Sequence, residues 1–158
     1  STRLYSFKPS TMDYEEWRNL VTIGYVGLVG DLFHAGHLNI LQFAKVYCQI
    51  VVAGVLTDEA VISYKRQPIF PFEERCRIIN HLEYVDFVIP QETLSYHDNL
   101  KLVKPTHLFH GKDWLNGIQR STREEVLRVL QEFGGTLIEP ERYEGISTTE
   151  IIEYIQNG

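Results

Sequence analysis

The chain has 158 residues, of which 44% are hydrophobic and 23% are charged, and its formal charge is −6. This length accommodates one hydrophobic core, and the composition is typical of a globular domain rather than of a disordered or fibrous chain. The acidic balance argues against a nucleic-acid-binding protein but leaves room for a local basic pocket that binds an anionic small molecule. The sequence lacks both a membrane-span pattern and a signal-peptide pattern, and its two distant cysteines suit reduced thiols, so we expect a cytoplasmic protein.

Alternating apolar and amphipathic segments predict the fold. The first 20 residues form a separate N-terminal arm with a short capped helix at 10–17, which we interpret as a surface arm or dimer contact, with an active-site lid as the alternative. Five short apolar segments, most of them with β-branched residues, predict strands, at 22–29, 50–56, 86–90, 107–111 and 135–139. Helices are predicted between and after them, at 37–47, 71–82, 121–133 and 148–156. Short apolar strands that alternate with helices predict an α/β domain at 21–158, built on a doubly wound parallel sheet.

Capping patterns support two of these helices. Ser121 and Glu124 have the spacing of a capping box, as do Ser147 and Glu150. The helix at 121–133 is followed by Gly134, a residue that commonly ends helices.

The turn after the first strand carries two histidines. Gly30 and Gly36 leave room for a phosphate to approach the backbone, and the start of the following helix presents free N–H groups and a favourable dipole. His34 and His37 lie three residues apart, on one side of the first helical turn. They could be zinc ligands, although no third ligand has a suitable spacing, or buried structural histidines. We favour the third alternative, in which both donate hydrogen bonds to a phosphoryl group.

A second turn with the same properties lies near the C-terminus. Gly145 precedes Ser147 and Thr148, whose hydroxyl and N–H groups stand at a helix start. Two such helix starts suggest a ligand with more than one phosphate, and a triphosphate fits best. Basic side chains in loops could then supply the countercharge, with a solvated surface position as the alternative for each; they are Lys65, Arg66, Arg75 and Arg142.

The two motifs together resemble a known superfamily. "HAGH" at 34–37 with "EGISTTEI" at 144–151 looks like the HxGH nucleotidylyltransferases, and Arg142 ahead of "EGISTT" is similar to the RTxGIST signature of the cytidylyltransferase branch. That branch includes the glycerol-3-phosphate, phosphocholine and phosphoethanolamine enzymes. Four further segments resemble the cytidylyltransferase domains found with phosphoenolpyruvate mutase in phosphonate biosynthesis, of the fosfomycin-pathway type: "YVGLVGDLFHAGHLNIL", "GVLTDEAVISYKRQP", "VIPQETLSY" and "HGKDW".

The resemblance implies a Rossmann-like fold and assigns roles to matching residues. His34 and His37 would stabilise the pentavalent α-phosphorus of a triphosphate, and Lys65 would bridge the nucleotide and the second substrate, with Arg142 as the fourth catalytic residue. Nucleotide-binding positions would be Val29, Gly30, Asp31, Gly36, Gly111, Asp113, Trp114, Gly145, Ile146, Ser147 and Thr148. Acceptor-binding positions would be Lys65, Arg75 and Lys112. Mg²⁺ would be carried by the triphosphate, and Asp31 is the best candidate for a protein ligand to it.

The sequence departs from the family pattern at two informative positions. Gly30 stands where the family places an aromatic residue, and Lys112 replaces the first Asp of a GDDW-like segment. These changes make the acceptor pocket of a glycerol- or choline-phosphate enzyme doubtful. We therefore expect CTP and a small phosphonate as substrates, with glycerol-3-phosphate or phosphoethanolamine as the alternative acceptor. The resemblance further implies a homodimer, and a fusion to or partnership with phosphoenolpyruvate mutase.

Overall fold

The structure, a computed structural model, describes residues 14–141, 145 and 147–157. Five strands form one parallel sheet in the order β3-β2-β1-β4-β5. The strands are β1 (Ile23–Leu28), β2 (Ile50–Leu56), β3 (Phe87–Gln91), β4 (His107–Phe109) and β5 (Thr136–Ile138). The chain runs outward from β1 to β3 and then returns to place β4 on the other side of β1. The order therefore changes direction beside β1, and ligands of such sheets bind at the carboxyl ends of the strands at this point.

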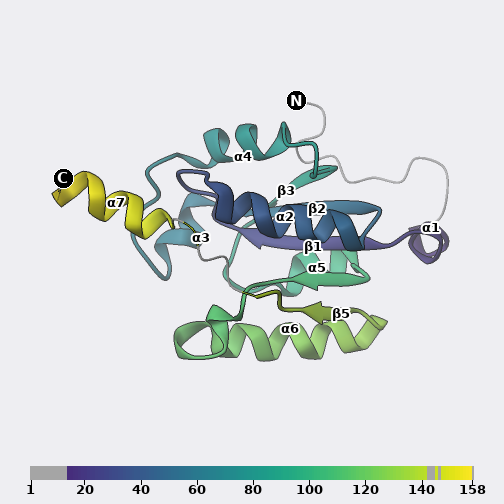
Figure 1. The fold of residues 1–158 in the computed structure, drawn as a ribbon. Helices are drawn as coiled ribbons and strands as arrows, with labels where there is room; N and C mark the ends of the chain where they lie inside the picture. The colour runs from purple at the N-terminus through teal and green to yellow at the C-terminus, as the bar shows by residue number, and fades with distance from the viewer. Residues whose placement is uncertain (1–13, 142–144, 146, 158) are drawn as a thin grey trace.

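Helices cover both faces of the sheet (Figure 1). One face packs on α2 (Ala35–Tyr47) and α4 (Phe72–Asn80), and the other packs on α5 (His97–Val103) and α6 (Arg120–Phe133). Neighbouring residues of β1 belong to different cores, since Val26 packs with α2 and α4 whereas Tyr25 packs with α5 and α6. This alternation explains why the strands are apolar at consecutive positions, and it confirms the predicted α/β, doubly wound parallel sheet.

The short elements were not predicted. They are α3 (Asp58–Ile62), α5, and the 3₁₀ turns η1 (Lys112–Trp114) and η2 (Gly117–Gln119). Each of the two helices has at most seven residues, which is too short for a repeating apolar pattern to emerge from the sequence.

The capping predictions had different outcomes. The Ser147–Glu150 capping box at the start of α7 (Thr148–Asn157) is confirmed, because each residue's backbone N–H donates to the other's side chain, at 3.1 and 3.2 Å. The predicted Ser121–Glu124 box is wrong, because α6 begins one residue earlier than predicted and its N-cap, Gln119, makes no side-chain capping bond. Gly134 ends α6 in the left-handed conformation, as predicted, with φ of 77°.

The described part of the N-terminal arm lies far from the carboxyl ends of the strands. In α1 (Tyr14–Leu20), Arg18 donates to the backbone carbonyls of Lys104 and Phe133. Both acceptors lie at helix ends that lead into strands, at the amino-terminal edge of the sheet. The lid interpretation is therefore wrong for residues 14–20, while residues 1–13 lie outside the described part of the chain.

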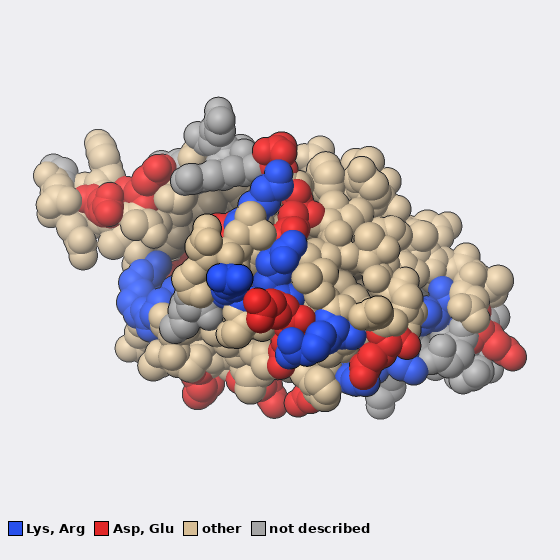
Figure 2. Space-filling model, turned by 90° about the horizontal axis from the view of Figure 1, so that it is seen from below, with Lys and Arg blue, Asp and Glu red and all other residues tan. Residues whose placement is uncertain are grey.

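Charges of both signs mix on the face that carries α6 (Figure 2). They include the ion pairs Lys101–Glu132 and, on α6 itself, Arg120–Glu124 at 3.6 Å. Among the residues that the structure describes, no helix is both long enough and apolar enough to cross a membrane.

Candidate functional site

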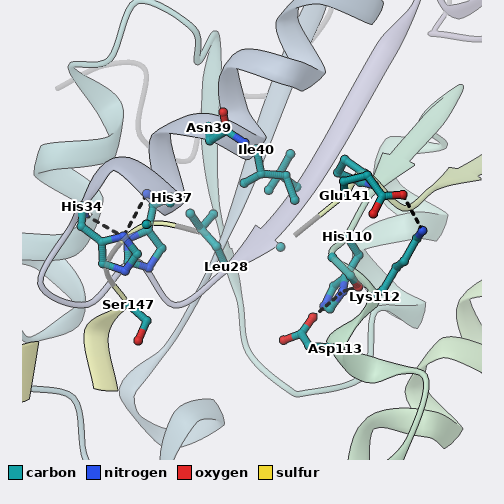
Figure 3. Close-up of a pocket in the computed structure, with 16 residues that line it drawn as sticks. Leu28, His34, His37, Asn39, Ile40, His110, Lys112, Asp113, Glu141 and Ser147 are labelled. Atoms are coloured by element: carbon teal, nitrogen blue, oxygen red, sulfur yellow. Dashed lines mark hydrogen bonds and ion pairs between the residues drawn. The ribbon is translucent and has the colours of Figure 1, made fainter. Parts of the chain in front are cut away.

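A cavity of about 510 Å³ opens where β1 and β4 end. Figure 3 shows two groups of polar side chains in it, with Leu28, Asn39 and Ile40 between them. One group consists of His34, His37 and Ser147, and the other consists of His110, Lys112, Asp113 and Glu141. Residues distant in sequence therefore form one site, because the parallel strands deliver their following loops to the same edge of the sheet.

The turn after β1 is fixed by a buried carboxylate. Asp31 is 2% exposed, and its oxygens accept bonds from the backbone N–H groups of Ile69 and Phe70, both at 2.9 Å, and from Arg66 at 3.1 Å. Burial opposes ionisation, but these donors more than offset it and hold the pKa of Asp31 below its usual range. The carboxylate therefore braces the turn, and its geometry does not fit the predicted role as a metal ligand.

Gly30 accounts for the missing aromatic residue. Its φ is 69°, a left-handed conformation that favours glycine, and a Cβ built there would lie 2.8 Å from Ile79 Cδ1. Backbone conformation and packing together exclude a large side chain. The departure from the family pattern is therefore a property of this turn and does not by itself identify the acceptor.

The two histidines form a reciprocal cap at the start of α2. His34 Nδ1 accepts from the Gly36 N–H at 3.0 Å, and His37 Nδ1 accepts from the His34 N–H at 3.1 Å. An Nδ1 atom that accepts a hydrogen bond carries no proton, so in each neutral ring the proton sits on Nε2. The cap therefore leaves two N–H donors on adjacent rings whose centroids are 3.9 Å apart.

Electrostatics favours the neutral form of both rings. Burial lowers the pKa of His37 to about 4, with contributions from His34 and Lys65. Burial likewise lowers the pKa of His34, against an opposing effect of Glu150. The described residues contain no group of three side chains suited to a metal ion, so the zinc interpretation has no support there. Two fixed donors beside a helix N-terminus are suited instead to binding an anion.

The start of α7 joins this turn directly. Thr148 Oγ1 donates to the backbone carbonyl of Asp31 at 2.9 Å, while Gly145 and Ser147 line the cavity. The N-termini of α2 and α7 therefore face one space, as predicted from the glycine-containing turns at the two helix starts. Arg142 and Ile146 lie outside the described residues, so their predicted roles stay predictions.

The opposite wall of the cavity is a stacked pair of rings at the end of β4. His110 stacks on Trp114 with centroids 3.5 Å apart and planes 6° apart. Trp114 is fully buried, and its Nε1 donates to Glu139 at 2.7 Å, while Arg123 binds the same carboxylate through two nitrogens. Trp114 therefore supports the wall but has no surface for the ligand contact predicted for it. His110 occupies that wall and was missed, although it lies in the predicted strand at 107–111, next to Gly111.

The predicted basic residues differ in their availability. Lys65 is exposed, its ammonium has no hydrogen-bond or ion-pair partner among the described residues, and the nitrogen lies 5.5 Å from the ring centroid of Tyr64. Although the Lys65 side chain is exposed, partial desolvation of its ammonium by surrounding residues and the positive charge of Arg66 lower the pKa of Lys65. Lys112 lines the cavity and pairs with Glu141 at 2.9 Å.

Arg75 is a structural residue rather than an acceptor-binding one. It is completely buried, and its guanidinium donates to the carbonyls of Phe70, Val29 and Leu56 and to the Asp58 carboxylate, at 2.7 to 2.9 Å. The prediction for Arg75 is therefore wrong, because its donors are consumed inside the protein. Val29 contributes its carbonyl to this network.

Comparisons with known proteins agree with this geometry. A family described as cytidylyltransferase-like matches residues 30–154. The chain is 28% identical over 158 residues to the bifunctional protein HldE of Bradyrhizobium diazoefficiens, covering 96% of this chain and 31% of the relative. It is 32% identical over 130 residues to the ethanolamine-phosphate cytidylyltransferase of Mus musculus, covering 77% of this chain and 30% of the relative. The chain thus spans about a third of the length of these curated relatives.

The fold also has solved neighbours. A lipopolysaccharide core biosynthesis protein from Thermoplasma volcanium superposes with a TM-score of 0.66 at 21% identity, covering 80% of this chain and 99% of the other. This likeness supports the Rossmann-like architecture.

Proposed function

Because this chain belongs to the cytidylyltransferase-like family, we propose that it transfers CMP from CTP to an oxygen of a small phosphorus-containing acceptor and releases pyrophosphate. The observation that carries the proposal is the convergence of two helix N-termini and two histidine N–H donors on one cavity. That set of donors is matched to a triphosphate, whose charge extends over several oxygens.

The reaction makes few demands on the protein. An acceptor phosphonate or phosphate oxygen is already ionised near neutral pH, so it needs no general base. This oxygen forms a bond to the α-phosphorus, and the bond from that phosphorus to the bridging oxygen breaks, so that pyrophosphate takes up the electron pair. Stabilising the charge on the α-phosphoryl oxygens is then the main catalytic requirement, and the Nε2–H groups of His34 and His37 are suited to it.

Lys65 is the proposed link between the two substrates. Its ammonium has no hydrogen-bond or ion-pair partner among the described residues, and it lies close enough to His37 to lower the pKa of that ring. A cation in this position favours the approach of two anions. In this proposal Mg²⁺ enters as part of the substrate, bound to the triphosphate.

The proposed acceptor is a small phosphonate, 2-hydroxyethylphosphonate or 2-aminoethylphosphonate. This choice rests on the segment resemblance to the phosphonate-pathway domains, as do the proposed mutase partner and homodimer. Phosphoethanolamine is the second candidate, favoured by the similarity to the mouse ethanolamine-phosphate enzyme. It differs from 2-aminoethylphosphonate only by the oxygen between carbon and phosphorus.

Pyrophosphate release from CTP tests the proposal. It should be measured with both phosphonates, phosphoethanolamine and glycerol-3-phosphate, and repeated with ATP. The expected result is turnover with CTP and highest kcat/KM for a phosphonate. A preference for a phosphate monoester would show that the proposed acceptor is wrong, and a preference for ATP would show that the proposed nucleotide is wrong. Absence of turnover with every pair of substrates would overturn the proposed activity.

A further inference from the structure

His110 is held rigidly at the wall of the cavity. Its side chain is 14% exposed, one face of the ring lies against Trp114, and Trp114 is itself anchored through Glu139 to Arg123. A ring fixed in this way presents the same edge to any ligand, which is the property needed for a selective contact.

The proton of His110 sits on the opposite nitrogen from those of the other two cavity histidines. Its Nδ1 lies 2.7 Å from the backbone carbonyl of Gly111, and a carbonyl only accepts, so Nδ1 carries the proton. Burial lowers the pKa of His110 and keeps the ring neutral near pH 7. The Nε2 atom is consequently an acceptor, whereas the Nε2 atoms of His34 and His37 are donors.

This acceptor is unused within the part of the chain that the structure describes. Asn80 Oδ1 is the one fully buried side-chain N or O atom there that lacks a partner, so the unpaired Nε2 of His110 is not sealed inside the protein. Because His110 lines the cavity, Nε2 is available to a ligand. A polar atom in this setting favours a ligand that supplies an N–H or O–H group.

The proposed CTP would reach this wall with its nucleobase. The anion-binding donors occupy one end, the His110 wall occupies the other, and the apolar side chains of Leu28 and Ile40 lie between them (Figure 3). A triphosphate at the first end directs the attached nucleoside towards the second. Apolar walls with a few fixed polar atoms are what a flat heterocycle needs.

We propose that His110 Nε2 accepts a hydrogen bond from the 4-amino group of cytosine and thereby makes the site select CTP over UTP. The inference rests on the proposed use of CTP. Cytosine presents an N–H donor at position 4, whereas uracil presents an acceptor there, which would face the lone pair of Nε2. The donors at the other end bind phosphates of either nucleotide and cannot distinguish them.

Binding of CTP and UTP with Mg²⁺ to the wild type and to H110F tests the contact by calorimetry. Phenylalanine keeps a flat ring on Trp114 but has no acceptor. The wild type should bind CTP roughly 10- to 100-fold more tightly than UTP, and H110F should lose most of this ratio through weaker CTP binding. H110Q is the rescue variant, because its amide can accept from cytosine or donate to uracil, so it should bind both nucleotides with similar affinity.

A ligand change makes the test independent of variant folding. The triphosphate of pyrimidin-2-one riboside lacks the 4-amino group, and the wild type should bind it roughly 10- to 100-fold more weakly than CTP. H110F should bind the two equally. Equal binding of CTP and the analogue by the wild type would overturn the role of His110 and leave the proposed function standing, whereas binding of neither CTP nor UTP would overturn both.

Discussion

The Thr148 hydroxyl donates a hydrogen bond to the backbone carbonyl of Asp31 across 2.9 Å, joining two segments that are 117 residues apart. Asp31 is itself bound through its carboxylate to the loop at Ile69 and Phe70. One contact therefore aligns the N-terminus of α7 with the turn that precedes α2. The relative position of the two anion-binding helix ends depends on it.

Removing this hydroxyl should weaken nucleotide binding. Thr148→Val keeps the side-chain shape but deletes the donor, so we expect the KM for CTP to rise roughly tenfold and the free energy of unfolding to fall by about 1 kcal/mol. Steady-state kinetics and urea titration measure the two effects. Thr149→Val is the matched control, because Thr149 is the exposed neighbour in the same helix turn. Similar kinetic changes in both variants would contradict the importance of the Asp31 contact.

The two nitrogens of His34 can be tested separately. In His34→Asn, the side-chain oxygen can still accept from the Gly36 N–H, but the Nε2–H donor is lost. We expect kcat to fall by ~10²-fold while stability is maintained. His34→Ala loses the cap as well. It should show the same decrease in kcat, and its free energy of unfolding should be about 1 kcal/mol lower than that of the wild type. Wild-type turnover in His34→Asn would show that the Nε2 donor is not catalytic.

The sheet was predictable because its signal is local and repeated. Each strand is a short, largely apolar run, and all but β4 contain β-branched residues. Because helices cover both faces of the sheet, consecutive strand residues are apolar, as Val26 and Tyr25 illustrate. The α3 and α5 helices were missed because their short lengths provide no period to detect. The Ser121–Glu124 spacing failed because α6 starts at Arg120, two residues earlier than a box with Ser121 as its N-cap requires.

The site was predictable where motif and helix start coincide, as at His34, His37 and Ser147. It was not predictable where burial decides the role of a side chain. Arg75 looked like an available cation, but its donors are consumed by carbonyls that come together only in the fold. His110 belongs to no recognisable sequence motif. Its place in the site depends on its stacking on Trp114, a contact that the sequence pattern does not reveal.

Loss of charge at Lys65 should therefore reduce activity, whereas loss of charge at Arg75 should reduce stability. Lys65→Met removes an exposed ammonium, so we expect kcat/KM for the acceptor to fall roughly 10- to 100-fold with a stability change within about 0.5 kcal/mol. Arg75→Met leaves buried carbonyls and Asp58 without their donor, and it should lower the free energy of unfolding by roughly 3 kcal/mol. Denaturant titration with acceptor kinetics on the folded protein separates the two. A stable Arg75→Met protein with a selective defect in acceptor binding would restore the original assignment.

His37 should make the protein less stable in acid. Its folded pKa of about 4 lies below the ordinary value of 6.5, so between these pH values the unfolded chain binds the proton more readily than the native protein. Stability is complete above pH 6.5 and decreases as the pH falls to about 4, by on the order of 2 kcal/mol for this partly exposed ring. His37→Asn keeps an acceptor for the His34 N–H but does not titrate there, so the free energy of unfolding should vary less between pH 7 and pH 4 than in the wild type. His81→Asn, on an exposed histidine, is the control, and identical pH profiles for wild type and His37→Asn would contradict a buried neutral His37.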